Sequence, residues 1–186
     1  MKHAAKSMPR GARIDPSELR ALGNPLDFIA DDHMRQREIC VMTEHLAQGE
    51  VPDIAQMEEL LAFLDHELCS HIEDEDRDLF GLMQRRCPAE DDIDAILPRL
   101  RANHDAALKS AARVRRLIAR QLANPVGFSD ADRKVLATFA DHARRHVIVE
   151  NAVVLPLARA RLGARDLDAL RLKMLRRRGL DRLLEE

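Results

Sequence analysis

Two pairs of side chains in this sequence have the chemistry and the spacing of metal ligands. His71 is followed four residues later by Glu75, and His146 is followed in the same way by Glu150. Four residues of an α-helix advance by about 400°, so the imidazole and the carboxylate of each pair lie on one face. Buried polar groups without partners cost roughly 2–7 kcal/mol each. If these faces are buried, a bound cation is the simplest way to neutralise them.

Apolar neighbours indicate that the face of His146 and Glu150 is buried. They lie on or beside this face and comprise Phe139, Val149, Val153 and Leu157. His142 lies one turn before His146 on the same face. We expect this histidine to stand behind the ligands or to line a pocket beside them, where it is also a candidate proton shuttle.

Two further histidines interrupt apolar helical stripes without a glutamate partner. They are His33, in the sequence DDH, and His104, in the sequence ANH. An isolated histidine of this kind is usually a core or surface residue, but these two precede His71 and His146 by similar separations. Two helical hairpins with this shared pattern bring four histidines and two glutamates to one level of a bundle. The pattern predicts a site for two metal ions.

The ligand types narrow the choice of metal. Imidazole binds Zn, Cu, Fe and Ni, whereas carboxylates that can bridge suit a hard pair of ions such as Fe or Mn. Four histidines and two glutamates therefore fit two iron ions best, with Mn or Zn as substitutes. The three cysteines, Cys40, Cys69 and Cys87, lie off these faces, so a thiolate site has no support.

Four long helices are expected to position these ligands. Caps and helix breakers place them at residues 24–48, 53–86, 89–124 and 129–162, and a short fifth helix at 164–178 packs across one end. Pro98 either kinks the third helix or marks its start. Besides the ligands, the predicted inward positions are Leu26, Ile29, Cys40, Leu60, Leu64, Leu68, Leu79, Leu82, Leu97, Leu100, Leu108, Ala111 and Ile118.

The sequence thus predicts an all-α fold, an antiparallel up-down four-helix bundle with a short extra C-terminal helix. We divide the chain into a mobile N-terminal segment (1–23), the bundle (24–163) and a C-terminal helix with a tail (164–186). Two charged clusters are expected to face solvent. They are the acidic residues Glu73, Asp74, Asp76 and Asp78, and the basic run 176–178.

Composition limits the class of protein. The chain of 186 residues has no Trp or Tyr and only 5 Phe, which favours helix over strand. Its net charge of -2 points to neither nucleic acid nor an anionic membrane as a partner. No segment approaches the roughly 18 apolar residues that cross a bilayer. Without a CxxC pair or an apolar signal segment, we expect a cytoplasmic protein with reduced thiols.

Four segments carry a resemblance to a known family. They are DDH at 31–33, HIEDEDRDLF at 71–80, NHDAAL at 103–108 and HVIVENAVVLPLA at 146–158. In this order they resemble the hemerythrin-like family, the HHE cation-binding domain, over roughly residues 25–162. The resemblance implies that the histidines are terminal ligands and that the glutamates bridge two irons. The ligands implied are His33, His71, His104 and His146, with Glu75 and Glu150.

Two features depart from the oxygen-carrying members of that family. Those proteins have a second histidine four residues after the one on the third helix, where this chain has Leu108. They also have a different acid spacing on the fourth helix. Fewer nitrogen ligands leave more open coordination positions, which argues against reversible oxygen carriage.

Several functions are compatible with such a site. The leading hypothesis is a non-haem di-iron protein that binds or senses O2, NO or peroxide, with an unknown protein partner. The alternatives are an enzyme that turns over peroxide or NO, an iron storage or repair protein, and a metal-free bundle. Two other metal motifs are rejected. HELCSH at 66–71 is one residue longer than the zinc-protease HExxH, and the ferritin motif Glu-x-x-His does not occur.

Overall fold

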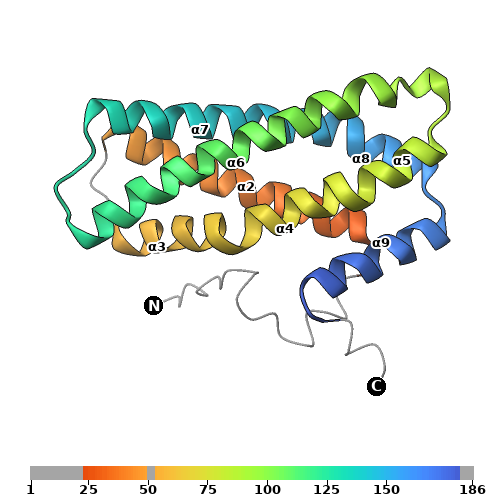
Figure 1. Cartoon of the computed structure of the whole chain (residues 1–186), viewed down its shortest axis with the longest axis horizontal. Helices are drawn as coiled ribbons and strands as arrows, with labels where there is room; N and C mark the ends of the chain where they lie inside the picture. The colour runs from red at the N-terminus through yellow and green to blue at the C-terminus, as the bar shows by residue number, and fades with distance from the viewer. Residues whose placement is uncertain (1–22, 50–52, 181–186) are drawn as a thin grey trace, which may run out of the picture.

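The computed structural model describes residues 23–49 and 53–180, and every regular element in this part of the chain is helical (Figure 1). Four long helical rods lie side by side in antiparallel order, and a shorter helix packs against one end (Figure 1). The predicted all-α four-helix bundle is therefore confirmed. Apart from Gly23, the segment predicted to be mobile lies outside the described residues. None of the helices in the two described ranges combines the length and the apolar character needed to cross a membrane.

The rods match the predicted helices, although two of them are subdivided. The first rod is α2 (Pro25–Gln48) and the third is α6 (Ile93–Ala123), which follows the short 3-10 turn η3 (Ala89–Asp91). The second rod consists of α3 (Ile54–Ala62), η1 (Phe63–Glu67), α4 (Leu68–Glu73), η2 (Asp74–Leu79) and α5 (Phe80–Arg86). The fourth consists of α7 (Asp130–Val149), η4 (Glu150–Val154) and α8 (Leu155–Arg161). The extra helix is α9 (Ala164–Arg177). Elements η1, η2 and η4 are π-helical turns.

Local capping explains why the rods begin and end where the sequence predicts. The Asn24 side chain accepts a hydrogen bond from the backbone two residues on (3.0 Å), and Pro25 takes the first helical position. Gly49 ends α2 in a left-handed conformation with φ of 90°. At the start of the fourth rod, Ser129 and Asp132 form a reciprocal capping box.

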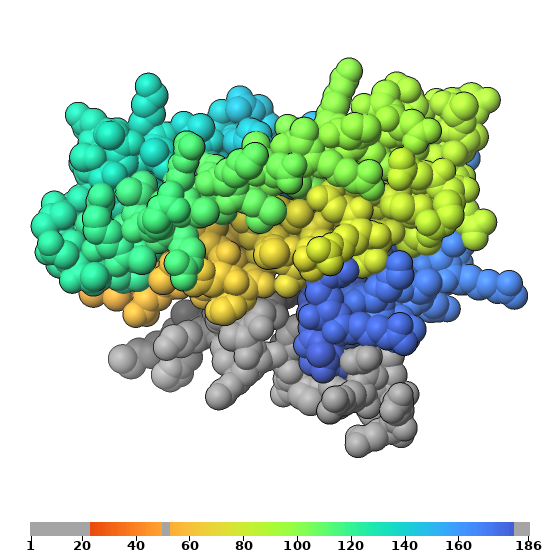
Figure 2. All heavy atoms as spheres, in the orientation of Figure 1, coloured from red at the N-terminus to blue at the C-terminus, as the bar shows by residue number. Residues whose placement is uncertain are grey.

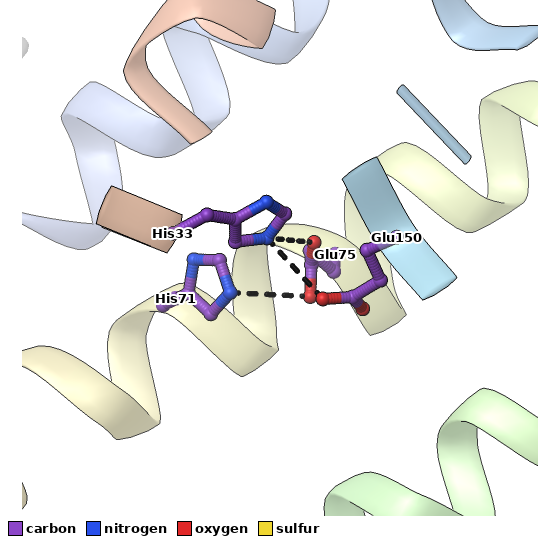
Figure 3. A group of neighbouring side chains, drawn as sticks. All are labelled: His33, His71, Glu75 and Glu150. Atoms are coloured by element: carbon purple, nitrogen blue, oxygen red, sulfur yellow. Dashed lines mark ion pairs between the residues drawn. The ribbon is translucent and has the colours of Figure 1, made fainter. Parts of the chain in front are cut away.

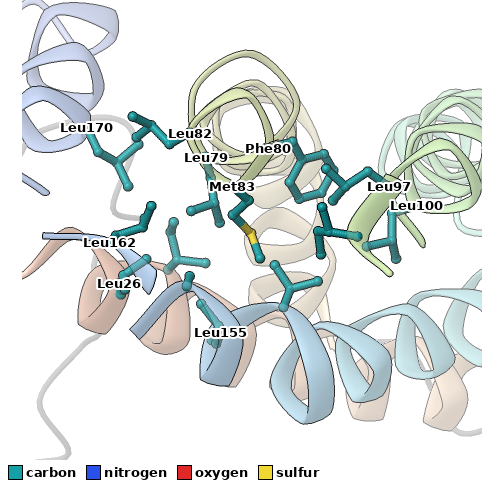
Figure 4. Close-up of a cluster of buried hydrophobic side chains, with 14 of the residues drawn as sticks. Leu26, Leu79, Phe80, Leu82, Met83, Leu97, Leu100, Leu155, Leu162 and Leu170 are labelled. Atoms are coloured by element: carbon teal, nitrogen blue, oxygen red, sulfur yellow. The ribbon is translucent and has the colours of Figure 1, made fainter. Parts of the chain in front are cut away.

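Two clusters of buried apolar side chains fill the bundle, one toward each end. The cluster next to α9 (Figure 4) includes Leu26, Ile29, Leu79, Phe80, Met83, Leu97, Val154 and Leu155. The other includes Ile39, Leu60, Leu64, Leu68, Val114, Ile118, Leu136 and Phe139. The predicted ligands lie between the clusters; on α2, for example, His33 stands between Ile29 and Ile39. The fold therefore holds a polar layer with apolar packing on both sides.

The apolar stripe of the fourth rod is displaced by one residue from the prediction. The turn η4 has the i→i+5 hydrogen bonding of a π-helix and takes up one extra residue after Glu150. Full burial consequently falls on Val154 and Ala158, whereas Val153 and Leu157 are half-buried. The polar residues of η2 and η4 are presented by turns that sequence periodicity does not reveal.

Two residues predicted to face the core are exposed. Val149 is 42% exposed, because it is adjacent to Glu150 in a helix and points about 100° away from it. Leu108 is 36% exposed, because the buried stripe of α6 continues from His104 to Ala107, three residues on rather than four. Both predictions were wrong by one residue on a helix.

Prolines have different positions in the two later rods. Pro98 lies inside α6 and does not mark its start. Pro156 is the second residue after η4, and Gly81 is the second residue after η2. Proline has no N–H to donate to the preceding turn, and glycine weakens a helix. The second and the fourth rods therefore both lose regularity at the level of these two residues.

The packing of α9 corrects the prediction that both charged clusters face solvent. Arg177 and Arg178 of the basic run turn toward η2, and Asp74 and Asp78 of the acidic cluster are buried against them. Arg176 is exposed as expected. The prediction failed because α9 lies directly on η2, a tertiary contact between segments far apart in the chain.

Candidate metal centre

All six predicted ligands converge in the polar layer. His33 comes from α2 and His104 from α6. The second rod supplies His71 and Glu75, and the fourth supplies His146 and Glu150. Every one of these residues is buried, and the most exposed, His146, is only 7% exposed. Figure 3 shows four of the side chains pointing toward one another from three rods.

One group of potential ligands consists of His33, His71, Glu75 and Glu150 (Figure 3). Nε2 of His33 lies 3.4 Å from Oε1 of Glu75 and 3.2 Å from Oε2 of Glu150. Nε2 of His71 lies 3.4 Å from Oε2 of Glu75. One ligand atom from each residue lies within 4.8 Å of those from the other three, so one cation can contact all four.

The second group contains the same two glutamates with His104 and His146. Nε2 of His104 lies 3.3 Å from Oε2 of Glu75 and 3.4 Å from Oε1 of Glu150. Nε2 of His146 lies 2.9 Å from Oε1 of Glu150 and 2.7 Å from Nε2 of His104. Glu75 and Glu150 therefore belong to both groups, and each group adds two histidines of its own.

Several buried atoms of this layer lack a hydrogen-bond partner. They are both carboxylate oxygens of Glu75 and of Glu150, together with Nε2 of His33 and of His71. The nitrogen–oxygen contacts that these atoms make, at 2.9–3.4 Å, are ion pairs without hydrogen-bond geometry. Buried polar atoms nearly always have a hydrogen-bond partner, whereas the ligands of one cation turn their lone pairs toward a shared point. The residues present therefore fit a pair of cations.

The Nδ1 atoms of His33 and His104, on the side away from the polar layer, also make contacts that favour metal binding. Nδ1 of His33 lies 3.0 Å from Oδ1 of Asn151, and Nδ1 of His104 lies 2.8 Å from Oδ1 of Asp76. When Nδ1–H donates to such an oxygen, the lone pair of a neutral imidazole is at Nε2, which faces the layer. Nδ1 of His71 stands 3.6 Å from Oδ2 of Asp32, an ion-pair contact.

Sequence reasoning did not identify Asp32, Asp76 or Asn151 as partners of the ligands. The sequence does contain one indication of their role, because each of the three is adjacent to a predicted ligand. However, each contacts a histidine on a different rod, so the pairing depends on how the rods are aligned.

Protons balance the two buried carboxylates when no cation is present. Burial lowers the pKa of His33, but the close contacts with the negatively charged Glu150 and Glu75 outweigh this and raise the pKa to about 10. Burial also lowers the pKa of His104, but Asp76 and the two glutamates raise it to about 11. Burial raises the pKa of Glu150, yet the surrounding imidazoles hold it well below its usual range. The layer thus requires positive charge, which metal ions can supply in place of protons.

A cavity of about 20 Å³ lies beside the layer. Three of the histidines line it, namely His71, His104 and His146, and so do Gln36 and Cys40. The rest of the lining is apolar and comprises Ile39, Phe63, Leu68, Ile72, Ala107, Phe139 and Ala143. The volume suffices for a molecule about the size of water. Gln36 is 5% exposed, and its Nε2 has no hydrogen-bond partner among the described residues.

The other predicted or rejected histidines lie outside the two groups. His142 is half-buried one turn before His146, and the cavity is lined at that turn by Ala143 instead. Burial and the neighbouring His146 lower the pKa of His142. His45 and His66, the first residue of the rejected HELCSH motif, are exposed.

Comparison with known proteins identifies one family. Residues 24–158 match the hemerythrin HHE cation binding domain, which covers well over half of the chain. The matched range contains all six residues of the polar layer and ends before α9. No curated protein and no solved structure gives a significant match. Cation binding is therefore the property that the comparison assigns to this domain.

Proposed function

This chain belongs to the hemerythrin HHE cation-binding domain family, and we propose that it holds two iron ions and binds or senses a small oxidant such as O2, NO or peroxide. The observation that carries the proposal is that both glutamates contact histidines of both groups. Glu75 lies 3.4 Å from His71 and 3.3 Å from His104, and Glu150 lies 3.2 Å from His33 and 2.9 Å from His146. Carboxylates in this position can bridge two ions.

The proposed ligand assignment follows from these contacts. His33 and His71 complete the ligands of one ion, and His104 and His146 complete those of the other. Bridging carboxylates with imidazole favour iron, and Mn and Zn suit the same ligand types. Two histidines and two shared carboxylates leave open positions at each ion. A reduced iron pair with open positions supplies electrons and a binding place for O2, NO or peroxide.

The cavity supports a small molecule as the ligand. Its volume of about 20 Å³ excludes larger substrates, and its apolar walls exclude bulk water. Gln36 is the polar exception, since its buried amide has a donor atom without a partner. An amide in this position can donate a hydrogen bond to a small oxidant and so orient it.

Burial favours a resident centre over iron storage. All six ligands are buried, so exchange with solvent requires the bundle to open. Turnover of peroxide or NO is the alternative function; His142, which stands one turn before His146 and outside the lining of the cavity, is its candidate proton shuttle. Cys40, Cys69 and Cys87 are unpaired, which supports a reducing cytoplasm as the location.

Metal analysis with an optical spectrum tests the proposal. Protein from iron-replete cells should contain about two irons per chain, with near-ultraviolet charge-transfer bands that bleach on reduction and return in air. The matched control is the exposed His45→Ala, which should retain both irons, whereas His146→Ala should lose iron. Protein with neither iron nor another metal would contradict the proposal. Steady consumption of peroxide or NO above that of free iron would favour the enzymatic alternative.

A further inference from the structure

Helix α9 and its C-terminal capping residue, Arg178, carry three cations toward the turn that supplies Glu75. This helix lies outside residues 24–158, the range matched by the family. Figure 2 shows it, in dark blue, against the yellow atoms of the second rod. Lys173, Arg177 and Arg178 pair with acidic residues of that rod. The contact therefore joins an element outside the family's domain to the wall of the metal centre.

Arg177 bridges three carboxylates at once. Its Nη1 contacts Oδ1 of Asp74, its Nη2 lies 2.6 Å from Oδ2 of Asp78, and its Nε lies 3.1 Å from Oε2 of Glu73. Arg178 reaches the second oxygen of Asp74, with its Nη2 2.7 Å from Oδ2. Both oxygens of Asp74 thus accept hydrogen bonds from the C-terminal end of α9 and its capping residue.

Burial makes these contacts more important than ordinary surface ion pairs. Asp74 is fully buried at 0% exposed, and Asp78 is 5% exposed. The arginine side chains are themselves only 16% and 13% exposed. A buried carboxylate that loses its cation is strongly destabilised, whereas an exposed one gains water instead. Within the described ranges, the arginine and lysine partners of Asp74 and Asp78 all come from α9 or from Arg178, the residue that caps its C-terminus.

Three consecutive residues of η2 point to three different partners. Asp74 is held by α9, Glu75 faces the histidines, and Asp76 accepts from Nδ1 of His104. The π-helical turn interrupts the regular hydrogen bonding of the α-helix around it, and the side chains on either side of Glu75 are both held by contacts outside the turn. The direction of Glu75 therefore depends on the anchors at the residues on either side of it.

We propose that Arg177 and Arg178 are positioning residues for the metal centre, which hold η2 so that Glu75 lies between the two histidine pairs. The proposal rests on the proposed function, because it assigns α9 a role in metal binding. Coupling between two sites is reciprocal. The docking of α9 strengthens metal binding, and metal binding in turn holds α9 on the bundle.

The test compares two sets of ion pairs on α9 in the full chain. Arg177→Gln with Arg178→Gln removes the contacts with η2. The control, Arg86→Gln, removes the two 2.9 Å hydrogen bonds between Arg86 and Asp166 at the other end of α9. Iron affinity is measured by competition with a chelator, and amide hydrogen exchange is measured over residues 74–80 in the metal-free protein. Exchange over α9 is compared with and without iron.

The double variant should bind iron at least about tenfold more weakly than the control, within the range of typical couplings. Its residues 74–80 should exchange faster, and iron should slow exchange of α9 in the unaltered chain. Should the double variant not fold, Arg177→Lys serves instead, since one ammonium cannot bridge three carboxylates in the geometry of a guanidinium. Arg177→Lys should then bind iron more weakly than both the unaltered chain and the Arg86→Gln control.

The possible failures can be distinguished. Iron affinity and exchange equal to those of Arg86→Gln would overturn the positioning role while leaving the iron site intact. An unaltered chain that binds no iron would refute the proposed function. Exchange over residues 74–80 in the metal-free variants would still decide whether the arginines hold the turn.

Discussion

Nδ1 of His104 lies 2.8 Å from Oδ1 of Asp76, the residue that follows Glu75. The same relationship recurs in the other half of the bundle, where Nδ1 of His33 lies 3.0 Å from the side chain of Asn151, the residue after Glu150. Each rod that supplies a carboxylate thus also orients a histidine of a different rod. The geometry of the metal centre is therefore set by the alignment of the rods rather than by any one helix.

Replacing Asp76 with alanine should weaken metal binding through His104. The imidazole loses the acceptor that fixes its tautomer and its orientation, and losses of this kind are about 10- to 100-fold in affinity. Competition with a chelator measures the change. Asp76→Asn keeps an acceptor oxygen and should retain more affinity. The control is Asp105→Ala, an exposed acid next to His104. Equal affinity in the Asp76 and Asp105 variants would show that the hydrogen bond does not orient the ligand.

The shared carboxylates predict unequal losses of metal. Glu75 contacts histidines of both groups, whereas His71 belongs to one group. Glu75→Ala should therefore lose both irons, and His71→Ala should retain about one per chain, because the other group keeps both histidines. Metal analysis after gel filtration distinguishes the outcomes, with the exposed His66→Ala as control. A Glu75→Ala protein that keeps one iron would show that this carboxylate does not bridge.

The ends of the rods and the identity of the ligands could be predicted from the sequence, whereas the contacts that the ligands make with other rods could not. Asn24, Gly49 and Ser129 cap the rods by local interactions, and such interactions can be recognised without the fold. The glutamates likewise stand out because they lie four residues after a histidine on an apolar stripe. These features are local.

The features that escaped prediction depend on contacts between rods. Val149 was assigned to the core because nothing nearby in the sequence separates the edge of an apolar stripe from its centre. Arg177 and Asp74 looked like solvated charges because only the docking of α9 brings them together. Asn151 could be recognised as a neighbour of a ligand, but its contact with His33 requires α2 and the fourth rod to be aligned.

Cys40 should resist alkylation in the folded protein. It is 1% exposed, and burial raises the pKa of its thiol to about 11, against the opposing charge of Arg144. Only about one molecule in a thousand carries the thiolate at pH 8, and the thiolate is the nucleophile. Iodoacetamide followed by mass spectrometry should show rapid modification of the exposed Cys69 and none of Cys40 until denaturant is added. Equal rates at both thiols would mean that the cavity opens freely to solvent.

Gln36 should control how long a small ligand stays in the cavity. Gln36→Leu keeps a similar volume but removes the amide, so the bound molecule loses one hydrogen bond. A net contribution of about 1 kcal/mol corresponds to roughly fivefold faster dissociation. Stopped-flow release of NO from the iron-loaded protein measures this rate, and metal analysis should show unchanged iron. Thr43→Val is the matched control, because Thr43 is a buried polar residue of the same helix that bonds to the Ile39 carbonyl and does not line the cavity. Dissociation at the same rate in the Gln36 and Thr43 variants would show that the ligand does not contact the amide.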